Sequence, residues 1–194
     1  MLRSSTICSF ATRLLGLTIF ISILVAVVFP SPQLSPPNTS QTCVQPPLDN
    51  CSFYADCLEP RYHCGPTGYP LGYGQKYCDA FQVARKTLSA EGQAWMVRTM
   101  HCLQLALVDD ALGTGPNATR TCAALEDKAF GTHARCYVQS GVCRLPVEDW
   151  EAILEIVHFR TLFDSWDALK ASLGAGTECL EFFVFLGKKT IDQW

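Results

Sequence analysis

The sequence predicts an all-α fold: a single disulfide-rich helical domain with a Gly/Pro-rich N-terminal loop region. Ten of the eleven cysteines lie downstream of an apolar N-terminal run, and an even set of cysteines in an exported chain forms disulfides. Apolar residues in the second half recur three and four positions apart, which is the spacing of a helix face. No stretch alternates apolar and polar residues for long enough to indicate a strand.

The N-terminal segment directs export. Arg3 and Arg13 precede an apolar run of 16 residues from Leu14 to Phe29, and no further charged residue appears before Asp49. This asymmetry keeps the N-terminus in the cytosol. Because a signal-peptide core has about 7 to 15 residues and a spanning helix about 20, residues 1–30 are either a cleaved signal peptide or a signal anchor. The domain is therefore either secreted or type II membrane-anchored, with residues 14–29 as the tether.

The exported part begins with a linker and continues as one domain. Residues 31–48 are rich in proline and predict a solvated, extended tether. Residues 49–194 are numerous enough to bury a hydrophobic core. Disulfides therefore reinforce this core, each by about 2 to 4 kcal/mol.

The charge balance disfavours polyanion partners. The chain has 15 Lys and Arg against 18 Asp and Glu, and removal of Arg3 and Arg13 leaves 13 against 18. A domain with this negative balance has no electrostatic reason to bind nucleic acid or an anionic lipid surface.

Between Cys51 and Cys78 the chain is dense in Gly, Pro and Tyr. The segment from Cys64 to Gly74 contains so many helix-breaking residues that it predicts no regular structure. We expect a loop there that is clamped at both ends.

Helical periodicity begins after Cys78 and predicts two apolar helix faces. The first face comprises Trp95, Thr99, Cys102, Leu103 and Ala106, and the second Trp150, Ile153, Leu154 and Val157. Pro146 stands at a first-turn position of the second helix. Glu148 and Asp149 follow where the helix dipole favours negative charge.

Three further helical features are predicted. Residues 113–116 separate two earlier helices, the later covering about 118–130 and extending towards Cys143. Thr161 to Asp164 has the spacing of a capping box, and Gly174 ends the helix that follows. The last helix is apolar on all sides between Phe182 and Leu186, so it is either buried in the core or a partner-binding or dimerising surface.

The residues do not assemble a recognisable metal or catalytic site. No exported cysteine has another within four positions, whereas structural zinc sites use close pairs such as C-x-x-C. The candidate general bases are His63, His101, His133 and His158. The sequence has neither a G-x-S-x-G motif nor an unpaired exported cysteine to serve as their nucleophile. We therefore expect no catalytic residue, metal ligand or cofactor, and we expect His158 to be partly buried on a helix.

The enzyme alternative is a secreted phospholipase A2-like helical hydrolase. That family is small, helical and disulfide-rich, and residues 64–74 have a superficial likeness to its calcium loop. The family's His-Asp pair is missing, however, because Cys102 follows His101. No acidic residue lies between Glu59 and Asp79 to bind calcium. We therefore expect the segment to form a turn-rich rim.

Three N-x-S/T sequons indicate N-linked glycosylation of a lumenal chain. Asn117 lies in a Gly-Pro loop ahead of a helix, Asn38 in the tether, and Asn50 beside Cys51, where disulfide formation competes with modification.

The order and spacing of the ten cysteines, with the residues around them, resemble the stanniocalcin family of secreted glycoprotein hormones. The segments that carry the resemblance are Cys51–Glu59, Tyr77–Phe81, Cys136–Tyr137 and Val142–Cys143. The resemblance implies five disulfides: Cys43 with Cys57, Cys51 with Cys78, Cys64 with Cys122, Cys102 with Cys136, and Cys143 with Cys179. The residues alone leave the connectivity open.

The resemblance implies a non-enzymatic extracellular glycoprotein with hormone-like or regulatory activity. It suggests a role in calcium and phosphate homeostasis and action by binding an extracellular protein, either a receptor or a protease such as a metalloproteinase. Beyond Cys179 this sequence has no further cysteine of the kind that joins stanniocalcin subunits, so a homodimer is expected to be non-covalent. The second alternative is a membrane-tethered adhesion or structural module.

Overall fold

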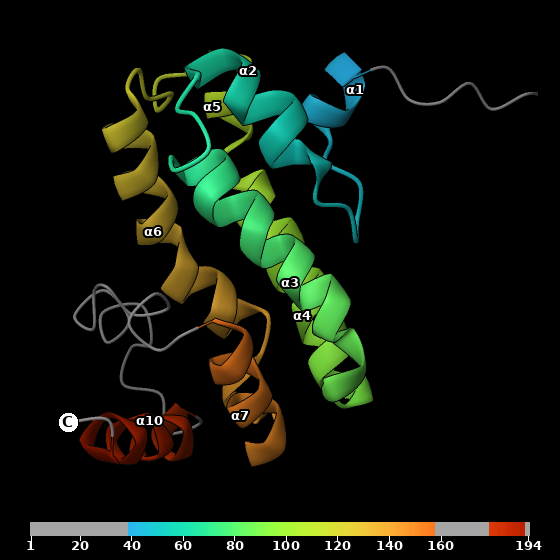
Figure 1. Cartoon of the computed structure of the whole chain (residues 1–194), viewed down its shortest axis with the longest axis vertical. Coiled ribbons are helices and arrows are strands. Elements are labelled where there is room, and N and C mark those ends of the chain that lie inside the picture. The colour runs from blue at the N-terminus through green and yellow to red at the C-terminus, as the bar shows by residue number, and fades with distance from the viewer. Residues whose placement is uncertain (1–38, 158–178, 193–194) are drawn as a thin grey trace, which may run out of the picture. The chain divides into compact units, whose positions relative to one another are not determined.

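The structure is a computed structural model that describes residues 39–157 and 179–192 (Figure 1). The described residues form helices joined by turns and include no strand. The predicted disulfide-rich, all-α fold is therefore confirmed. All described residues belong to one compact unit of the chain.

The helices follow one another along the chain with short connections. In the N-terminal part they are α1 (Thr39–Val44), the π-helix η1 (Tyr54–Leu58), α2 (Glu59–Tyr62), the π-helix η2 (Tyr69–Gln75), α3 (Lys76–Ala84) and the 3₁₀-helix η3 (Arg85–Thr87). The second part contains α4 (Ala90–Leu105), α5 (Val108–Leu112), α6 (Cys122–Gln139), the 3₁₀-helix η4 (Val142–Arg144), α7 (Val147–Ile156) and α10 (Leu180–Asp192).

Helix α1 lies where the sequence predicts an extended tether. Residues 39–44 are helical, and buried Cys43 is bonded to Cys57 in η1. The tether prediction is wrong for these residues because the disulfide holds them against the helical domain. The N-terminal apolar run lies outside the described residues, so its role as signal peptide or anchor stays a prediction. Within the described ranges, no helix has the length and apolar character needed to span a bilayer.

The Gly/Pro-rich segment is more regular than predicted, since η2 runs directly into α3. Pro70 stands in the first turn of η2, where a missing N–H group needs no partner. A Cβ atom on Gly74 would collide with the buried ring of Tyr54, and one on Gly72 with the backbone of Thr67. These glycines permit close packing of helices and do not mark a loop.

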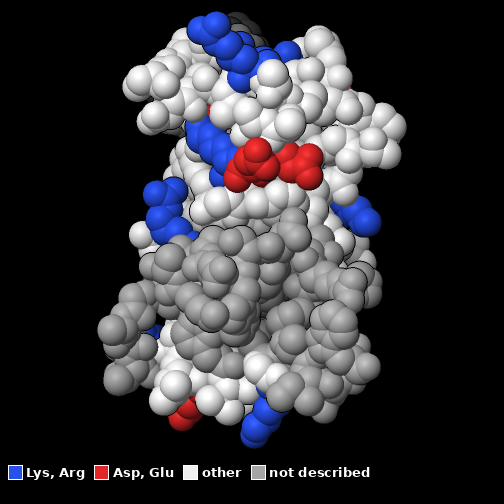
Figure 2. Space-filling model, turned by 90° about the vertical axis from the view of Figure 1, so that its left-hand side faces the viewer, with Lys and Arg blue, Asp and Glu red and all other residues white. Residues whose placement is uncertain are grey.

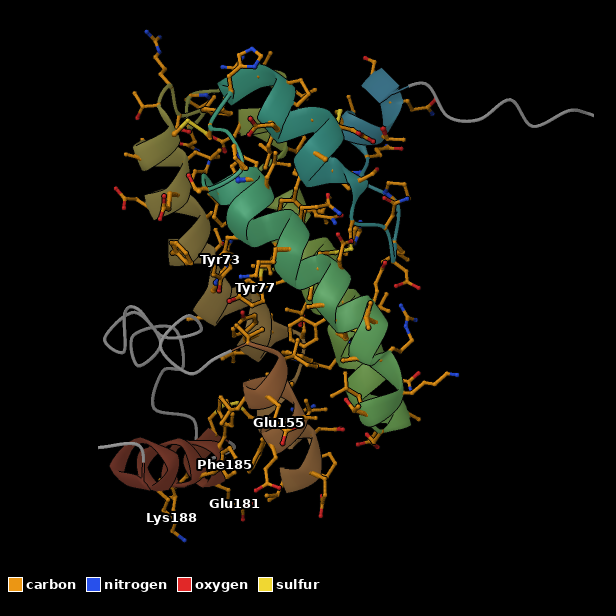
Figure 3. All side chains as sticks on the ribbon, in the orientation of Figure 1. Tyr73, Tyr77, Glu155, Glu181, Phe185 and Lys188 are labelled. Carbon is orange, nitrogen blue, oxygen red and sulfur yellow. A yellow bond between two sulfur atoms is a disulfide. The ribbon has the colours of Figure 1, made fainter. Side chains whose placement is uncertain are left out.

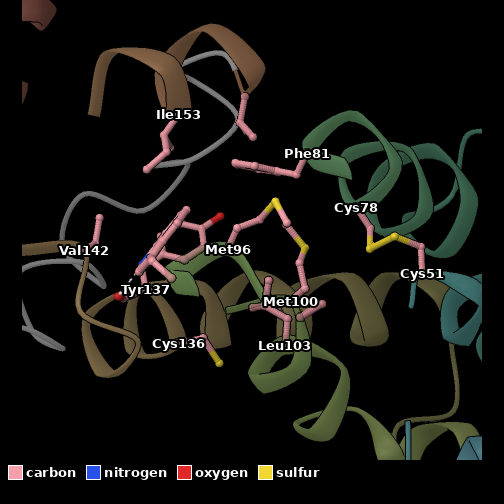
Figure 4. Packing of buried hydrophobic residues seen from close by; sticks show 14 of the residues in the cluster. Cys51, Cys78, Phe81, Met96, Met100, Leu103, Cys136, Tyr137, Val142 and Ile153 are labelled. Carbon is pink, nitrogen blue, oxygen red and sulfur yellow. Dashed lines mark hydrogen bonds between the residues drawn. A yellow bond between two sulfur atoms is a disulfide. The ribbon is translucent and has the colours of Figure 1, made fainter. Parts of the chain in front are cut away.

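The two predicted apolar faces are confirmed as the centre of the core. Trp95 of α4 and Trp150 of α7 are buried, and their indole N–H groups donate to the carbonyl oxygens of Tyr137 (3.2 Å) and Val142 (2.8 Å). Figure 4 shows Met96 of α4 beside Tyr137 of α6. The core therefore joins helices that are far apart in sequence, and both of these buried indole N–H groups have hydrogen-bond partners.

The start of α6 differs from the prediction, whereas that of α7 agrees. Helix α6 begins at Cys122 because the Thr121 side chain accepts a hydrogen bond from the Ala124 N–H (3.2 Å), which makes Thr121 the N-cap. Helix α7 begins directly after Pro146, as expected. Buried Asp149 of α7, however, accepts hydrogen bonds from the Ser89 N–H (2.7 Å) and hydroxyl (2.6 Å). Its carboxylate therefore holds the residue that caps α4.

Helix α10 has both a buried and an exposed side. The rings of Phe182 and Phe185 lie 5.2 and 5.4 Å from that of Trp150, and Figure 3 shows Lys188 pointing away from this contact. Leu180 and Val184 are exposed. Burial in the core therefore describes one face of the helix, and a partner-binding or dimerising role of the other face stays a prediction. The predicted features at 161–164 and Gly174, and His158, lie outside the described residues.

Candidate recognition surface

Five disulfides hold the described helices together. They join Cys43 with Cys57, Cys51 with Cys78, Cys64 with Cys122, Cys102 with Cys136, and Cys143 with Cys179. These are the pairs that the stanniocalcin resemblance implies. Cα–Cα separations of 4.7 to 5.7 Å are in the range of protein disulfides. The bridges fix the described helices relative to one another.

The candidate general bases in the described residues, which are His63, His101 and His133, make contacts that support the fold. The His101 ring nitrogen Nε2 lies 3.0 Å from the Pro46 carbonyl oxygen, and His63 ends α2 in the left-handed conformation. His133 is only 3% exposed and stacks on the rings of Tyr73 and Tyr137, with centroids 5.5 and 5.6 Å away. None of these arrangements pairs a histidine with a nucleophile, as a catalytic dyad requires.

Burial determines the protonation of the aromatic core. It lowers the pKa of His133 to about 4, because the charged imidazolium is poorly solvated there. Burial also raises the pKa values of Tyr54 and Tyr137. His133 is therefore a neutral packing residue at pH 7, and its Nδ1 atom has no hydrogen-bond partner in the structure.

The segment compared with a calcium loop serves other purposes. Residues 69–75 are helical, and the nearby Glu59 carboxylate accepts a hydrogen bond from the Gly65 N–H (2.8 Å). Across residues 39–157 and 179–192, no group of three or more His, Cys, Asp or Glu side chains is arranged to hold a metal ion.

Two open hollows adjoin α4, and both are lined by Arg98. One has a volume of about 450 Å³ and lies between α4 and the turn at Ser140, and its lining includes both Arg144 and the acidic Glu91. The other has a volume of about 400 Å³ and is lined by apolar and basic side chains: Leu48, His101, Leu105 and Arg135. We call the residues Leu48, Arg98, His101, Leu105, Arg135 and Arg144 the Arg98 surface.

Hydrogen bonds hold the parts of the Arg98 surface in place. The Arg98 guanidinium donates to the Ser140 carbonyl oxygen through Nε (3.3 Å) and Nη2 (2.9 Å). Two contacts with α4 hold the residues that flank Leu48 in the sequence. The Gln104 side chain donates to the Asn50 carbonyl oxygen (2.6 Å), and the His101 ring contacts the Pro46 carbonyl oxygen. Leu48 and Leu105 stay 61% and 49% exposed. The second hollow thus presents positive charge beside apolar side chains, whereas Glu91 adds a negative charge to the first.

Sequence reasoning missed this surface because it followed only the apolar face of α4. Arg98, His101 and Leu105 are spaced three and four apart and so share another face of the helix. Arg135 comes from α6 and precedes Cys136, whose disulfide to Cys102 brings it beside α4. A search for polar residues adjacent to bridged cysteines would have indicated His101 and Arg135, which precede Cys102 and Cys136.

On the face shown in Figure 2, the basic side chains of the described residues lie in separate groups, with an acidic cluster between them. A nucleic acid or similar polyanion requires an extended positive stripe, which these described residues do not form on this face.

Two of the predicted glycosylation sites lie in the described chain. Asn50 and Asn117 are both exposed, as a modified asparagine must be. Asn38 lies outside the described residues, and occupancy of all three sequons stays a prediction.

Comparison with known proteins identifies the family. The stanniocalcin family model matches residues 33–179, about three quarters of the chain and a range that includes all five disulfides. Searches of curated proteins and of solved structures returned no match. With the matched range, the cysteine pairing and the all-α fold in agreement, the chain belongs to the stanniocalcin family.

Proposed function

We propose that this chain is an extracellular, non-enzymatic regulatory glycoprotein that acts by binding another protein through the Arg98 surface. Membership of the stanniocalcin family supports a secreted regulatory protein. Hormone-like activity, including a role in calcium or phosphate homeostasis, is part of the proposal. The observation that carries the binding role is the basic and apolar lining of the second hollow, on a chain with more acidic than basic residues.

The chemistry of the surface describes its partner. Arginines and exposed leucines favour a protein segment that alternates acidic and apolar side chains, because opposite charges steer association and apolar contacts add affinity. Arg98 is already oriented by Ser140, so less conformational entropy is lost when the partner binds. The partner is an extracellular receptor or protease that presents such a segment.

Charge reversal at Arg135 tests the binding surface. Arg135 is exposed on α6 and lines the second hollow, so Arg135→Glu places a repulsive charge there without disturbing the core. Lys86→Glu is the matched control, since Lys86 is exposed in η3 and lines neither hollow. The measurement is saturation binding of labelled protein to intact cells.

We expect binding at least tenfold weaker for Arg135→Glu and unchanged for Lys86→Glu. Equal weakening by both variants would mean that net charge, and not this surface, governs binding. Tight binding that neither variant alters would remove the Arg98 surface from the proposal.

Assays of hydrolysis test the enzyme alternative. We expect the purified protein to release no fatty acid from phosphatidylcholine vesicles with calcium. His101→Ala should lower the free energy of unfolding by only about 1 kcal/mol, because it removes one side-chain hydrogen bond to Pro46. Calcium-dependent hydrolysis that disappears in His101→Ala would establish the enzyme instead.

Secretion separates the proposal from a membrane-tethered module. We expect the native protein in the culture medium and in the supernatant after alkaline extraction of membranes. Retention of the full-length chain in the extracted membranes would favour the adhesion alternative.

A further inference from the structure

A buried carboxylate, that of Asp110, is at the centre of the contacts that attach the loop after α5 to the domain. The fully buried Asp110 accepts hydrogen bonds at Oδ1 from the Thr119 N–H (2.7 Å) and the Thr119 hydroxyl (2.8 Å). Lys128 of α6 forms an ion pair with its other oxygen. The Tyr62 hydroxyl donates to the Thr119 carbonyl oxygen (2.8 Å). Figure 1 shows α2, α5 and the start of α6 together at this end of the structure.

These contacts keep the buried carboxylate charged. Burial alone raises the pKa of Asp110, but hydrogen bonds from Lys128 and Thr119 outweigh this effect and hold the pKa below its usual value. A buried charge is tolerated only when it is paired and hydrogen-bonded. The network is therefore complete only when Thr119 and Lys128 are both in place.

Thr119 is also the hydroxyl residue of the sequon at Asn117. N-linked modification requires a serine or threonine two positions after the asparagine. In the folded chain Asn117 is exposed, but the Thr119 hydroxyl is hydrogen-bonded to Asp110 and lies 2.8 Å from that of Tyr62. In the folded chain, Asn117 is therefore exposed, but the Thr119 hydroxyl that the sequon requires is already hydrogen-bonded.

We propose that Asn117 accepts an N-linked glycan only before the Asp110 network closes, and that Thr119 afterwards becomes a structural partner of Asp110. The donor is a lipid-diphosphate-linked oligosaccharide. A bond forms between the Asn117 side-chain nitrogen and the anomeric carbon of the first sugar, while the bond from that carbon to the diphosphate breaks. The lipid diphosphate is the leaving group, and the amide nitrogen loses one proton to the transferring enzyme, an oligosaccharyltransferase.

The order of these residues along the chain leaves a period during synthesis in which Asn117 can be modified. Tyr62 and Asp110 precede the sequon, but Lys128 follows Thr119 by nine residues and is placed by α6. Until Lys128 arrives, burial of Asp110 is unfavourable and Thr119 stays accessible. Once the network has formed, the glycan is compatible with it, because Lys128 contacts the Asn117 backbone oxygen (2.9 Å) and not its side chain.

Glycosylation of the full chain in two states tests the inference. Unglycosylated protein is prepared folded with its disulfides, and also reduced, alkylated and unfolded. Each is incubated with purified oligosaccharyltransferase and lipid-linked oligosaccharide, and the occupancy of Asn117 is followed by peptide mass spectrometry. We expect modification of the unfolded chain at least tenfold faster than that of the folded chain. Equal rates, or no modification of Asn117 in either state, would overturn the proposal.

Two folded variants identify the responsible contact. Tyr62→Phe removes one donor to Thr119 and should raise the rate at Asn117 several-fold while the core stays intact. Asp110→Asn removes the ion pair with Lys128 and should raise it further. Asp109→Asn is the matched control at the neighbouring exposed position and should leave the rate unchanged. Failure of both Tyr62→Phe and Asp110→Asn to accelerate modification in the folded state would show that the network does not protect the sequon.

Discussion

Residues 39–75 and the helices α4, α6 and α7 are both helical, but they are held in different ways. In the first region the helices are short, and two glycines of η2 allow the backbone to pack against Tyr54 and Thr67. Three of the five disulfides have at least one cysteine there. In the second region longer helices bury large side chains such as Trp95 and Trp150 on one face.

The difference shows that a segment rich in helix-breaking residues can be helical when tertiary contacts require it. Gly costs about 1 kcal/mol more than Ala in a helix interior, and short helices are marginal alone. In residues 39–75 disulfides and close packing offset these costs. In α4, α6 and α7 the burial of an apolar face is the main contribution, to which the Cys102–Cys136 disulfide between α4 and α6 adds.

The largest expected effect comes from removing disulfides. Cys51→Ala with Cys78→Ala, and Cys102→Ala with Cys136→Ala, open loops of similar separation, 27 and 34 residues. Each pair should lower the free energy of unfolding by about 3 kcal/mol, measured in urea. Hydrogen exchange distinguishes the regions: the first variant should lose protection at residues 54–62, whereas the second should retain it in α4 and α6. Equal loss of protection in both would contradict the comparison.

Asp149 is expected to have the next largest effect, in the second region. Asp149→Ala leaves the Ser89 N–H and hydroxyl without their partner and should lower the free energy of unfolding by about 2 to 3 kcal/mol. Glu148→Ala changes the preceding, exposed carboxylate and should alter it by less than about 0.5 kcal/mol. Urea denaturation of both variants provides the measurement. Similar losses of stability in the two variants would mean that Glu148 and Asp149 both stabilise the protein through the helix dipole of α7, and not Asp149 through its contact with Ser89.

Two glycine substitutions should have opposite signs. Gly74→Ala forces a methyl group into the ring of Tyr54 and should destabilise the protein by about 1 to 3 kcal/mol. Gly131→Ala adds a methyl group to the exposed side of α6, where nothing lies within 4 Å, and should stabilise it by about 0.5 to 1 kcal/mol. Thermal unfolding of both variants gives the signs. A neutral Gly74→Ala would remove close packing as the reason for glycine in η2.

The mildest of the destabilising effects is a pH dependence from His133. Its pKa is about 4 in the folded chain and near 6.5 when unfolded. Between these values the unfolded chain binds more protons, so stability is full above pH 6.5 and falls as the pH drops towards 4. The free energy of unfolding should decrease by about 1 to 2 kcal/mol between pH 7 and pH 5.

His133→Phe keeps a ring between Tyr73 and Tyr137 and should remove most of this dependence, whereas His101→Gln should retain it. Urea denaturation at both pH values tests the assignment. An unchanged slope in His133→Phe would place the titrating group elsewhere.

Much of the fold was predictable because its signals are local. The apolar residues of α4 and α7 recur at helical spacing, Pro146 marks the start of α7, and the cysteine order indicates the disulfide framework. The start of α6 was placed four residues early, since the cap at Thr121 is a weaker signal than the apolar periodicity. Helicity at residues 69–75 was not predictable, because close packing against Tyr54 depends on a residue outside the segment.

The sequence by itself determined the helical class, the export of the cysteines, the sequon at Asn117 and the apolar faces, because each depends on residue type or on spacing within a few turns. Only the tertiary structure decided that Asp149 supports α4, that Thr119 joins Asp110, and that Arg98 and Arg135 share a surface. Hydrogen bonds and charge pairs act over a few ångströms, and helix packing alone brings residues such as Ser89 and Asp149 within that range.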